Sequence, residues 1–289
     1  MKAYIIAYMK RTNAMVNMNV NLSINDKYLE SIRRDGYVLV KQAAPDEAVA
    51  DLKEYISSFK YSDEQEISIA ENLQRLNGFG KTIYNICAKR PDVLRLFIRG
   101  VPGALLKALL NDKYYPSLDV SLPNYILRAA HFRSSKEAMP YHIDSFIPYS
   151  GNYSSVVQCM LFLNNSTLQN GCTLVVPNSH KSASYAPQGF NPQALPIEAE
   201  PGDMVMIDSR IWHATLANDT GADRWALIAT FSRWYIKQGY DYPRVLSQSV
   251  FDGLEDDEKI VFGYCSTVPL DEFEKTELKT GLDKAKPNL

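Results

Sequence analysis

Two histidines and one aspartate are spaced so that they could bind a single metal ion. His142 and Asp144 stand two residues apart in the stretch 140–146, PYHIDSF. In an extended strand, side chains two residues apart point to the same face, so the imidazole and the carboxylate can converge. His213 is the nearest suitable third ligand. Two histidines and one carboxylate form the facial set that binds iron(II) and leaves coordination positions open.

An arginine that follows these three residues requires an anionic partner. Arg224 lies eleven residues after His213 and opens the apolar run 225–231, WALIATF, which predicts a buried strand. An arginine that enters a core strand cannot lose its proton, so it needs a planar anionic partner. A bound dicarboxylate would supply one. An ion pair with the nearby Asp219 or Asp223 is the alternative.

With these residues in place, the chain resembles the phytanoyl-CoA dioxygenase-like branch of the iron(II)/2-oxoglutarate-dependent oxygenases. The resemblance extends from about residue 32 to residue 273 and rests on motifs in a fixed order. These motifs are 36–40 (GYVLV), 142–144 (HID), 170–181 (NGCTLVVPNSHK), 201–203 (PGD), His213 and Arg224. An H-x-D tripeptide alone is weak, but the ordered set with the eleven-residue step to arginine is specific.

The resemblance implies roles for the matching residues. His142, Asp144 and His213 would hold iron as the catalytic set. Arg224, assisted by the hydroxyl group of Thr215, would bind the distal carboxylate of 2-oxoglutarate. Dioxygen would be the other co-substrate, and succinate and carbon dioxide would be released. Halogenating relatives replace the carboxylate ligand with a small residue, so Asp144 favours hydroxylation over chlorination, while desaturation, cyclisation and epoxidation stay open.

Length and composition agree with a globular enzyme. The chain has 289 residues, of which 46% are hydrophobic and 22% charged, enough for a sizeable core. A net charge of −2 gives no electrostatic reason to expect nucleic acid or an anionic membrane as a partner, so a small-molecule substrate is expected. Four cysteines without C-x-x-C spacing predict reduced, structural thiols and a cytoplasmic location. The apolar stretch 3–9 is too short for a membrane span.

The order of the predicted elements favours a mainly β fold with flanking helices. Helices are predicted over 25–34, from Pro45 onward, and over about 90–99 and 103–110. Strands are predicted over 37–41, 125–132, 156–163, 173–176, 203–208 and 225–231. Short strands after a helical first third are typical of a jelly roll, here a double-stranded β-helix core braced by helices.

The domain organisation follows from the same pattern. We expect a flexible N-terminal extension over 1–22 and one jelly-roll oxygenase domain over 23–289. Its helical N-terminal part precedes the strands. The acidic stretch 255–258 is expected to start a solvated helix, and 279–289 to be a polar tail.

Other residues are candidates for the pocket. Gln158 lies in an apolar strand, and because a buried amide needs hydrogen-bonding partners, it is a candidate cofactor-binding residue. Alternation along 125–133 places His131 and Arg133 on one face and Arg128 on the other. The candidate substrate-contacting residues are Arg128, His131, Arg133, Tyr141 and Phe146. His180 follows a turn and is expected to be a structural hydrogen-bonding residue, and Trp212 a core residue.

Two other classes of protein remain open. One is a cupin-like metalloenzyme that does not use 2-oxoglutarate, although such an enzyme would not need Arg224. The other is a non-catalytic jelly-roll binding protein, which would not need His142, Asp144, His213 and Arg224 together. For the oxygenase, we expect a small polar metabolite or natural-product intermediate as substrate. The segments 146–155 and 182–196 are long enough to cover the site.

Overall fold

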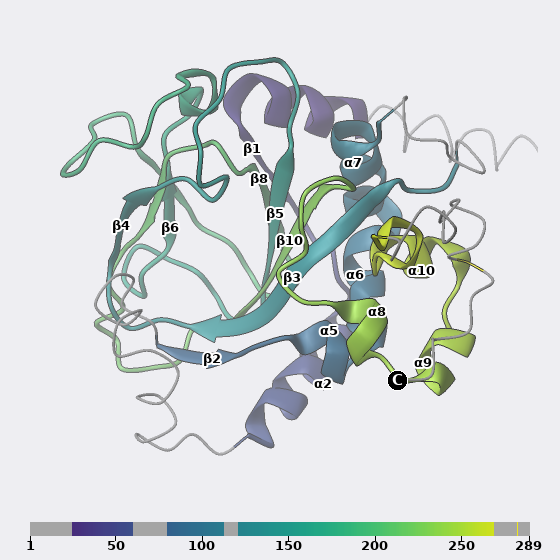
Figure 1. The fold of residues 1–289 in the computed structure, drawn as a ribbon. Helices are drawn as coiled ribbons and strands as arrows, with labels where there is room; N and C mark the ends of the chain where they lie inside the picture. Colours follow the sequence, from purple (N-terminus) through teal and green to yellow (C-terminus); the bar gives the residue numbers. More distant parts are fainter. Residues whose placement is uncertain (1–24, 60–79, 113–120, 269–281, 283–289) are drawn as a thin grey trace, which may run out of the picture.

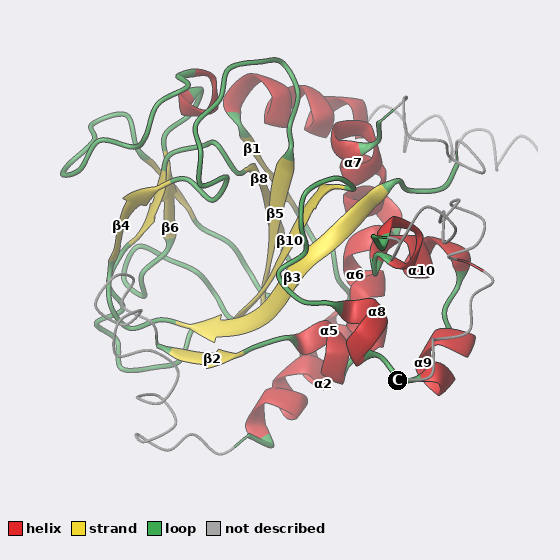
Figure 2. Ribbon diagram, in the orientation of Figure 1, coloured by secondary structure: helices red, strands yellow, loops and turns green. Residues whose placement is uncertain are grey.

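The computed structural model describes residues 25–59, 80–112, 121–268 and 282, and its strands form two sheets (Figures 1 and 2). The larger sheet has the order β1-β8-β5-β10-β3-β2, and the smaller sheet has the order β4-β9-β6-β7. The strands of the larger sheet are β1 (Tyr37–Val40), β2 (Lys81–Ile83), β3 (Tyr125–Ser134), β5 (Val156–Phe162), β8 (Met204–Asp208) and β10 (Ala226–Arg233). Those of the smaller sheet are β4 (Met139–His142), β6 (Thr173–Val175), β7 (Leu195–Ile197) and β9 (His213–Thr215).

Helices cover one face of the larger sheet, and in Figure 1 most of them lie on the side away from β4 and β6. A helical segment over 25–35 precedes β1. The α-helices that follow are α2 (Asp46–Ser57), α5 (Ile86–Lys89), α6 (Arg95–Ile98), α7 (Gly100–Leu110), α8 (Tyr242–Val245), α9 (Gln248–Asp252) and α10 (Asp256–Val261). Short 3-10 helices are η1 (Pro91–Leu94), η2 (Ser179–Lys181) and η3 (Tyr264–Ser266).

The main core lies between these helices and the outer face of the larger sheet. The apolar stripe of α2, namely Val49, Leu52 and Ile56, is buried in the same cluster as Val157 and Leu161 of β5. Each such side chain, when fully buried, contributes about 1.5–3 kcal/mol relative to its exposed state. The predicted helical stripe is therefore confirmed as part of the core.

A second core lies between the two sheets. Val205 and Ile207 of β8 pack there with Val175 of β6 and Ile197 of β7. The intervening Met206 of β8 faces the helices instead. Because successive strand residues point to opposite faces, strands buried on both sides need continuous apolar runs. This double burial confirms the predicted jelly roll with flanking helices.

The structure corrects some predicted boundaries. The predicted helix over 90–99 is divided into η1 and α6. The strands β2, β4, β7 and β9 have only three or four residues each, too few for a periodic signal in the sequence. The predicted extension over 1–22 lies outside the described residues, as does the tail 279–289 apart from Leu282. The single-domain boundary at residue 23 therefore stays a prediction.

The acidic helix α10 is not simply solvated, as the sequence had suggested. Glu258 is fully buried and pairs with Arg95 through two contacts, Nε to Oε1 at 2.6 Å and Nη2 to Oε2 at 3.1 Å. Glu258 also accepts a hydrogen bond from the backbone N–H of Glu255 and so caps the helix. Burial raises the pKa of Glu258, but these hydrogen bonds outweigh it and leave the pKa below its ordinary value.

Two further expectations from composition can be compared with the structure. All four cysteines are buried, as predicted for structural thiols. Within the described part of the chain, no helix has both the length and the apolar composition required to cross a bilayer.

Candidate active site

The three predicted metal ligands meet on the inner face of the smaller sheet. His142 ends β4 and is directly opposite His213, the first residue of β9, with 4.1 Å between the ring centroids. Asp144 lies between them, with its Oδ1 3.6 Å from the Nε2 of His142 and its Oδ2 3.4 Å from the Nε2 of His213. One ligand atom from each residue lies within 4.8 Å of the other two. His213 also pairs with Val175, which belongs to the core between the sheets, so it faces inward.

Asp144 reaches this site from a turn, and not from an extended strand as the sequence had suggested. Strand β4 ends at His142, and residues 144 and 145 form a turn. The backbone N–H groups of Asp144 and Ser145 both donate to the carbonyl oxygen of Ser209, at 2.8 and 3.0 Å. The predicted convergence of the ligands is correct, but strand alternation is the wrong reason for it.

The two histidines are oriented by backbone carbonyl groups. The Nδ1 atom of His142 lies 2.9 Å from the carbonyl oxygen of Pro140, and that of His213 lies 3.1 Å from the carbonyl oxygen of Ile211. A carbonyl oxygen can only accept, so each Nδ1 carries the proton. In a neutral ring, Nε2 then presents a lone pair, which is the arrangement typical of metal-binding histidines.

The carboxylate of Asp144 completes the donor set. Burial raises its pKa, but the neighbouring His213 and His142 outweigh this effect and bring the pKa well below its ordinary value. Its Oδ2 atom is buried and has no hydrogen-bond donor among the described residues. Once both rings are neutral, this partly buried carboxylate would face two imidazole lone pairs and would need a cation to compensate it. The residues present therefore fit a divalent metal ion.

Arg224 precedes β10 and is buried, with 7% of its surface exposed. Its backbone N–H donates to the hydroxyl of Ser134 at 3.0 Å, and its Nη1 lies 3.4 Å from the hydroxyl of Ser166. Its Nε atom has no partner in the described part of the chain, and burial lowers the pKa of its guanidinium group. No ion pair joins Arg224 to Asp219 or to Asp223 in the described structure, and Asp223 pairs with Lys81 at 2.9 Å. Arg224 thus keeps hydrogen-bonding capacity for an anion.

Ser166 is a hydroxyl residue beside Arg224 that the sequence analysis did not identify, and the role of Thr215 in binding 2-oxoglutarate stays a prediction. Thr215 shares the inward face of β9 with His213 and pairs with Thr173 of β6. No hydrogen bond joins Thr215 to Arg224 in the described structure, whereas the hydroxyl of Ser166 lies 3.4 Å from the Nη1 of Arg224. Ser166 was missed because it lies in the segment after β5, where no periodic pattern distinguishes it from neighbouring polar residues.

Gln158 belongs to the inner face of the larger sheet. It pairs with Thr230 of β10 and with Ile207 of β8, which lies in the core between the sheets. Its strand neighbours Val157 and Cys159 point to the helices, so Gln158 points toward the smaller sheet. Its amide makes no hydrogen bond to the described residues, so its role in cofactor binding remains a prediction.

A β-bulge changes the predicted direction of Arg128. Thr230 of β10 pairs with Ala129 of β3, whereas Phe231 pairs with Leu127, so Arg128 is left between two ladder positions. Leu127 joins the core on the helix side, and Arg128 lies with Ala129 on the other face. The prediction that Arg128 lies on the face opposite to His131 and Arg133 is therefore wrong. The guanidinium of Arg128 lies 5.5 Å from the ring centroid of Phe146, two residues after Asp144.

The remaining polar residues of β3 differ in charge. His131 stacks near Tyr84 at 6.1 Å between ring centroids, and burial lowers its pKa to about 4, so it is neutral at pH 7. Burial likewise lowers the pKa of Arg133 to about 10, and its Nε donates to the hydroxyl of Ser135 at 2.7 Å. At pH 7 the positive charges on the inner face of β3 therefore come from its arginines and not from His131.

Two residues near the triad have contacts that sequence could not indicate. Tyr141 contributes its backbone carbonyl group, which accepts from the Nε2 of Gln188 at 3.1 Å. Phe146 has a positive φ of 64° and is 70% exposed beside the site. That conformation is rare for a non-glycine residue and directs the ring over Arg128.

Two predictions about neighbouring residues have different outcomes. His180 is buried, and its Nε2 lies 3.3 Å from the carbonyl oxygen of Arg33, as expected of a structural residue. Trp212 is only partly buried, and its indole N–H donates to the carbonyl oxygen of Ser184 at 3.0 Å. The expectation of a core tryptophan was therefore wrong, because Trp212 holds the segment 182–196 against β9.

Comparison with known proteins gives a family for this arrangement. Residues 32–226 match the phytanoyl-CoA dioxygenase (PhyH) family, a range that contains all three metal-site residues and Arg224. An uncharacterized protein of Mycobacterium bovis is 29% identical over 162 residues, which cover 55% of this chain and 55% of that protein. Dioxygenase af480 of Aspergillus fumigatus is 33% identical over 133 residues, or 44% of this chain and 40% of that protein. The chain thus spans about half the length of the curated relatives it matches.

A solved structure shows the same fold. HygX from Streptomyces hygroscopicus, with nickel and 2-oxoglutarate bound, superposes with a TM-score of 0.56 at 14% identity, covering 73% of this chain and 88% of HygX. The dioxygenase family that the sequence predicts is the one that the family comparison returns, and HygX has also been solved with iron bound. Since the family match covers more than half of the chain, the protein belongs to the phytanoyl-CoA dioxygenase family.

Proposed function

We propose that this protein is an iron(II)- and 2-oxoglutarate-dependent dioxygenase that hydroxylates an aliphatic C–H bond of a small metabolite or natural-product intermediate. The main observation is that His142, Asp144 and His213 converge within 4.8 Å in a family of dioxygenases. Two histidines and one carboxylate suit iron(II) and leave positions for other ligands.

Each residue of the site has a distinct part in this proposal. The Nε2 atoms of the two histidines and the carboxylate of Asp144 hold the metal, while the carbonyls of Pro140 and Ile211 keep the rings oriented. Iron, 2-oxoglutarate and dioxygen together supply oxidative decarboxylation to succinate and carbon dioxide, coupled to insertion of one oxygen atom into a substrate C–H bond.

Arg224 is the proposed anchor for 2-oxoglutarate. Its guanidinium is buried, and the described residues offer it a hydroxyl group but no carboxylate. A planar guanidinium can bind a carboxylate through two parallel hydrogen bonds. The distal carboxylate of 2-oxoglutarate would therefore satisfy both its charge and its unused Nε–H group.

The carboxylate ligand favours hydroxylation as the outcome. Asp144 occupies the position that halogenating relatives leave to a small residue, so halide has no vacant ligand position there. Desaturation and cyclisation depend on where the substrate carbon lies and not on the ligands. Hydroxylation is the simplest reaction compatible with the complete triad.

For the substrate, we propose an anionic group bound by Arg128. The Nε of Arg128 donates to the carbonyl oxygen of Lys237 at 3.3 Å, and its guanidinium is stacked against Phe146. The bulge in β3 turns it toward the metal-site turn, and the terminal N–H groups have no partner among the described residues. An arginine held in this way is suited to a carboxylate or phosphate. Tyr141, His131 and Arg133 are proposed as further substrate contacts.

Substrate charge can be tested with paired compounds. Succinate release is measured for a panel of small carboxylic acids and their methyl esters, with the parent protein and Arg128→Gln. We expect acids to be preferred, and we expect kcat/KM for the best acid to fall by about 10–100-fold in the variant, the loss typical of a charge-assisted hydrogen bond. An active neutral ester that the variant turns over as well as the parent would contradict the proposal.

The two other classes make different predictions for the same site. A cupin-like metalloenzyme that does not use 2-oxoglutarate would bind iron but would leave Arg224 buried without an anion. A non-catalytic binding protein would not need a metal at all. Arg224 has no carboxylate partner among the described residues and an Nε–H group without an acceptor, which supports the oxygenase over both.

The proposed function is tested by anaerobic spectroscopy. Iron(II) and 2-oxoglutarate are added to the metal-free protein, and we expect a visible metal-to-ligand charge-transfer band. Succinate in place of 2-oxoglutarate is the control, because it lacks the keto oxygen and should give no band. Admission of dioxygen should then release succinate. Iron binding without the band would favour the cupin-like alternative, and absence of iron binding would favour the non-catalytic one.

A further inference from the structure

Two of the three metal-site residues are held by one short turn, residues 208–211. The carbonyl oxygen of Ser209 accepts from the backbone N–H groups of Asp144 and Ser145, at 2.8 and 3.0 Å. Two residues later, the carbonyl oxygen of Ile211 lies 3.1 Å from the Nδ1 of His213. The position of this turn therefore sets both the carboxylate and one imidazole of the triad.

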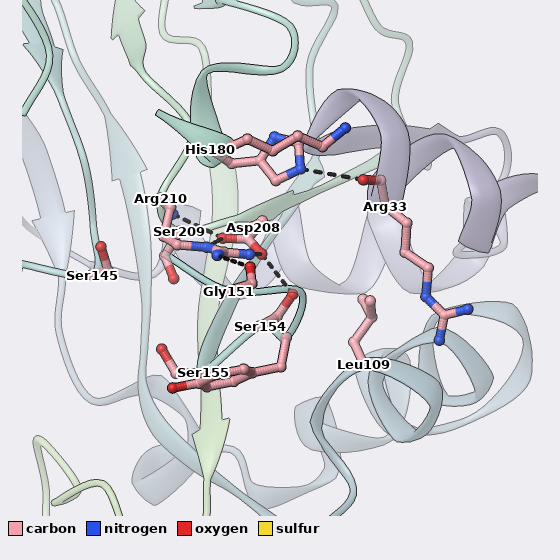
Figure 3. A network of polar contacts seen from close by, with 12 residues as sticks. Arg33, Leu109, Ser145, Gly151, Ser154, Ser155, His180, Asp208, Ser209 and Arg210 are labelled. Atoms are coloured by element: carbon pink, nitrogen blue, oxygen red, sulfur yellow. Dashed lines mark hydrogen bonds and ion pairs between the residues drawn. The ribbon is translucent and has the colours of Figure 1, made fainter. Parts of the chain in front are cut away.

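A buried ion pair closes this turn. Asp208 and Arg210 flank Ser209, and Figure 3 shows their side chains in direct contact. The Oδ1 of Asp208 accepts from the backbone N–H and from the Nε of Arg210, at 3.0 and 2.8 Å. Its Oδ2 accepts from the Nη2 of Arg210 at 2.8 Å and from the hydroxyl of Ser154 at 2.6 Å. Both side chains are nearly inaccessible, with 3% and 6% exposed.

Arg210 also contacts the segment 146–155, which follows Asp144. Its Nη1 donates to the carbonyl oxygen of Gly151 at 2.8 Å, and its guanidinium lies 4.5 Å from the ring centroid of Tyr149 (Figure 3 shows the Gly151 contact). The hydroxyl of Tyr149 in turn accepts from the backbone N–H and the hydroxyl of Ser155, at 2.8 and 2.7 Å. Residues 149–155 are thus bound to the turn 208–211 through Arg210, in addition to any role in covering the site.

We propose that the Asp208–Arg210 pair is a positioning device for the metal site, which holds the turn 208–211 so that Ser209 and Ile211 place Asp144 and His213. The inference rests on the proposed function only in requiring that the triad binds a metal. A buried pair of opposite charges is a poor source of stability compared with apolar packing, so its strict geometry is better explained by orientation. Neither side chain is a metal ligand.

A second ion pair, with a buried carboxylate and a half-exposed arginine, provides the control. Glu258 and Arg95 also form a two-contact pair, and the carboxylate side chain is 1% exposed. This pair joins α10 to α6 and has no described contact with the triad or with the turn 208–211. Asp208→Asn and Glu258→Gln each remove one buried carboxylate charge with little change of shape. A loss of general stability should affect both variants, whereas a loss of orientation should affect only the first.

The experiment uses cobalt(II) as the metal probe, with the full chain. Dissociation constants are measured by titration, the ligand geometry is followed by the visible d–d spectrum, and the fold is checked by unfolding of the metal-free protein. We expect Asp208→Asn to raise the cobalt(II) dissociation constant by up to about 10–100-fold, the loss found when a group hydrogen-bonded directly to a metal ligand is removed, and to change the spectrum. Glu258→Gln should lose unfolding stability but keep the parent dissociation constant and spectrum.

Arg210→Lys is the second variant, for use if Asp208→Asn does not fold. Lysine keeps the positive charge beside Asp208 but cannot reproduce the planar fork or the contact with Gly151. We expect a smaller change of the same sign in both metal affinity and spectrum. If the folded variants of the Asp208–Arg210 pair bind cobalt(II) like the parent, with an unchanged spectrum, the pair is only structural and the inference is overturned.

The outcomes separate this inference from the proposed function. If the parent binds cobalt(II) but gives no charge-transfer band with iron(II) and 2-oxoglutarate, the proposed function fails while the positioning role can still be judged. If the band is present and the variants bind the metal like the parent, only the positioning role fails. A parent protein that binds no metal overturns both.

Discussion

His213→Ala is expected to raise the iron(II) dissociation constant by more than about 100-fold and to abolish succinate release from 2-oxoglutarate, since loss of an outer-shell partner alone already costs 10–100-fold. His213 supplies one of three ligand atoms within 4.8 Å, and it is 4% exposed, so water cannot easily replace the imidazole in the same position. Equilibrium titration of the anaerobic protein with iron(II) measures the affinity, and succinate is quantified after dioxygen is admitted.

The matched control is His180→Gln. His180 is as buried as His213, at 4% exposure, but its Nε2 contacts the carbonyl oxygen of Arg33 and lies outside the metal cluster. We expect this variant to lose some unfolding stability and to keep the parent iron affinity. If folded His213→Ala bound iron as tightly as the parent, or if His180→Gln lost iron to the same extent, the assignment of the ligands would be wrong.

Arg224→Met should weaken 2-oxoglutarate binding and, at the same time, stabilise the ligand-free protein. The dissociation constant for 2-oxoglutarate should rise by about 100–1,000-fold, because a carboxylate bound by a buried guanidinium would lose its counter-charge. The free energy of unfolding of the protein without 2-oxoglutarate should increase by about 1–4 kcal/mol, because a buried cation without a carboxylate partner is replaced by an apolar side chain of similar length. A residue that was merely structural would not give this combination.

Chemical denaturation, with and without 2-oxoglutarate, measures both effects in one experiment. The parent should gain stability when 2-oxoglutarate and iron(II) are added, and Arg224→Met should gain much less. Ser166→Ala is the control of smaller effect, because it removes only the hydroxyl 3.4 Å from the Nη1 of Arg224. If Arg224→Met destabilised the ligand-free protein and left 2-oxoglutarate binding unchanged, Arg224 would be a structural residue and the anchor would lie elsewhere.

Much of the site could be predicted from residue type and spacing. His142, Asp144, His213 and Arg224 were identifiable because few side chains can bind a metal or an anionic group, and their order along the chain matches the family. The layers were also predictable, since β5, β8 and β10 are buried on both faces and therefore require continuous apolar runs. Candidate ligands and buried strands can be recognised because they depend on residue type and local apolar pattern, and both can be read directly from the sequence.

The orientation of the same residues could not be predicted in this way. Asp144 points to the metal site because its backbone binds the carbonyl oxygen of Ser209, a partner far along the chain. Arg128 points inward because β3 has one more residue than β10 between their paired positions. Ser166 is placed beside Arg224 only when β5 and β10 lie side by side.

Residue type and order thus specify the ligands, the buried strands and the family, because these follow from the chemistry and polarity of individual side chains. Strand register, bulges and backbone hydrogen bonds between distant segments specify where each side chain points. They arise from hydrogen bonds between backbone N–H and C=O groups. Nearly every residue carries the same two groups, so the sequence does not show which ones pair. For this reason the turn 208–211, whose backbone carbonyls contact two of the three candidate ligands, and its Asp208–Arg210 pair became visible only in the folded protein.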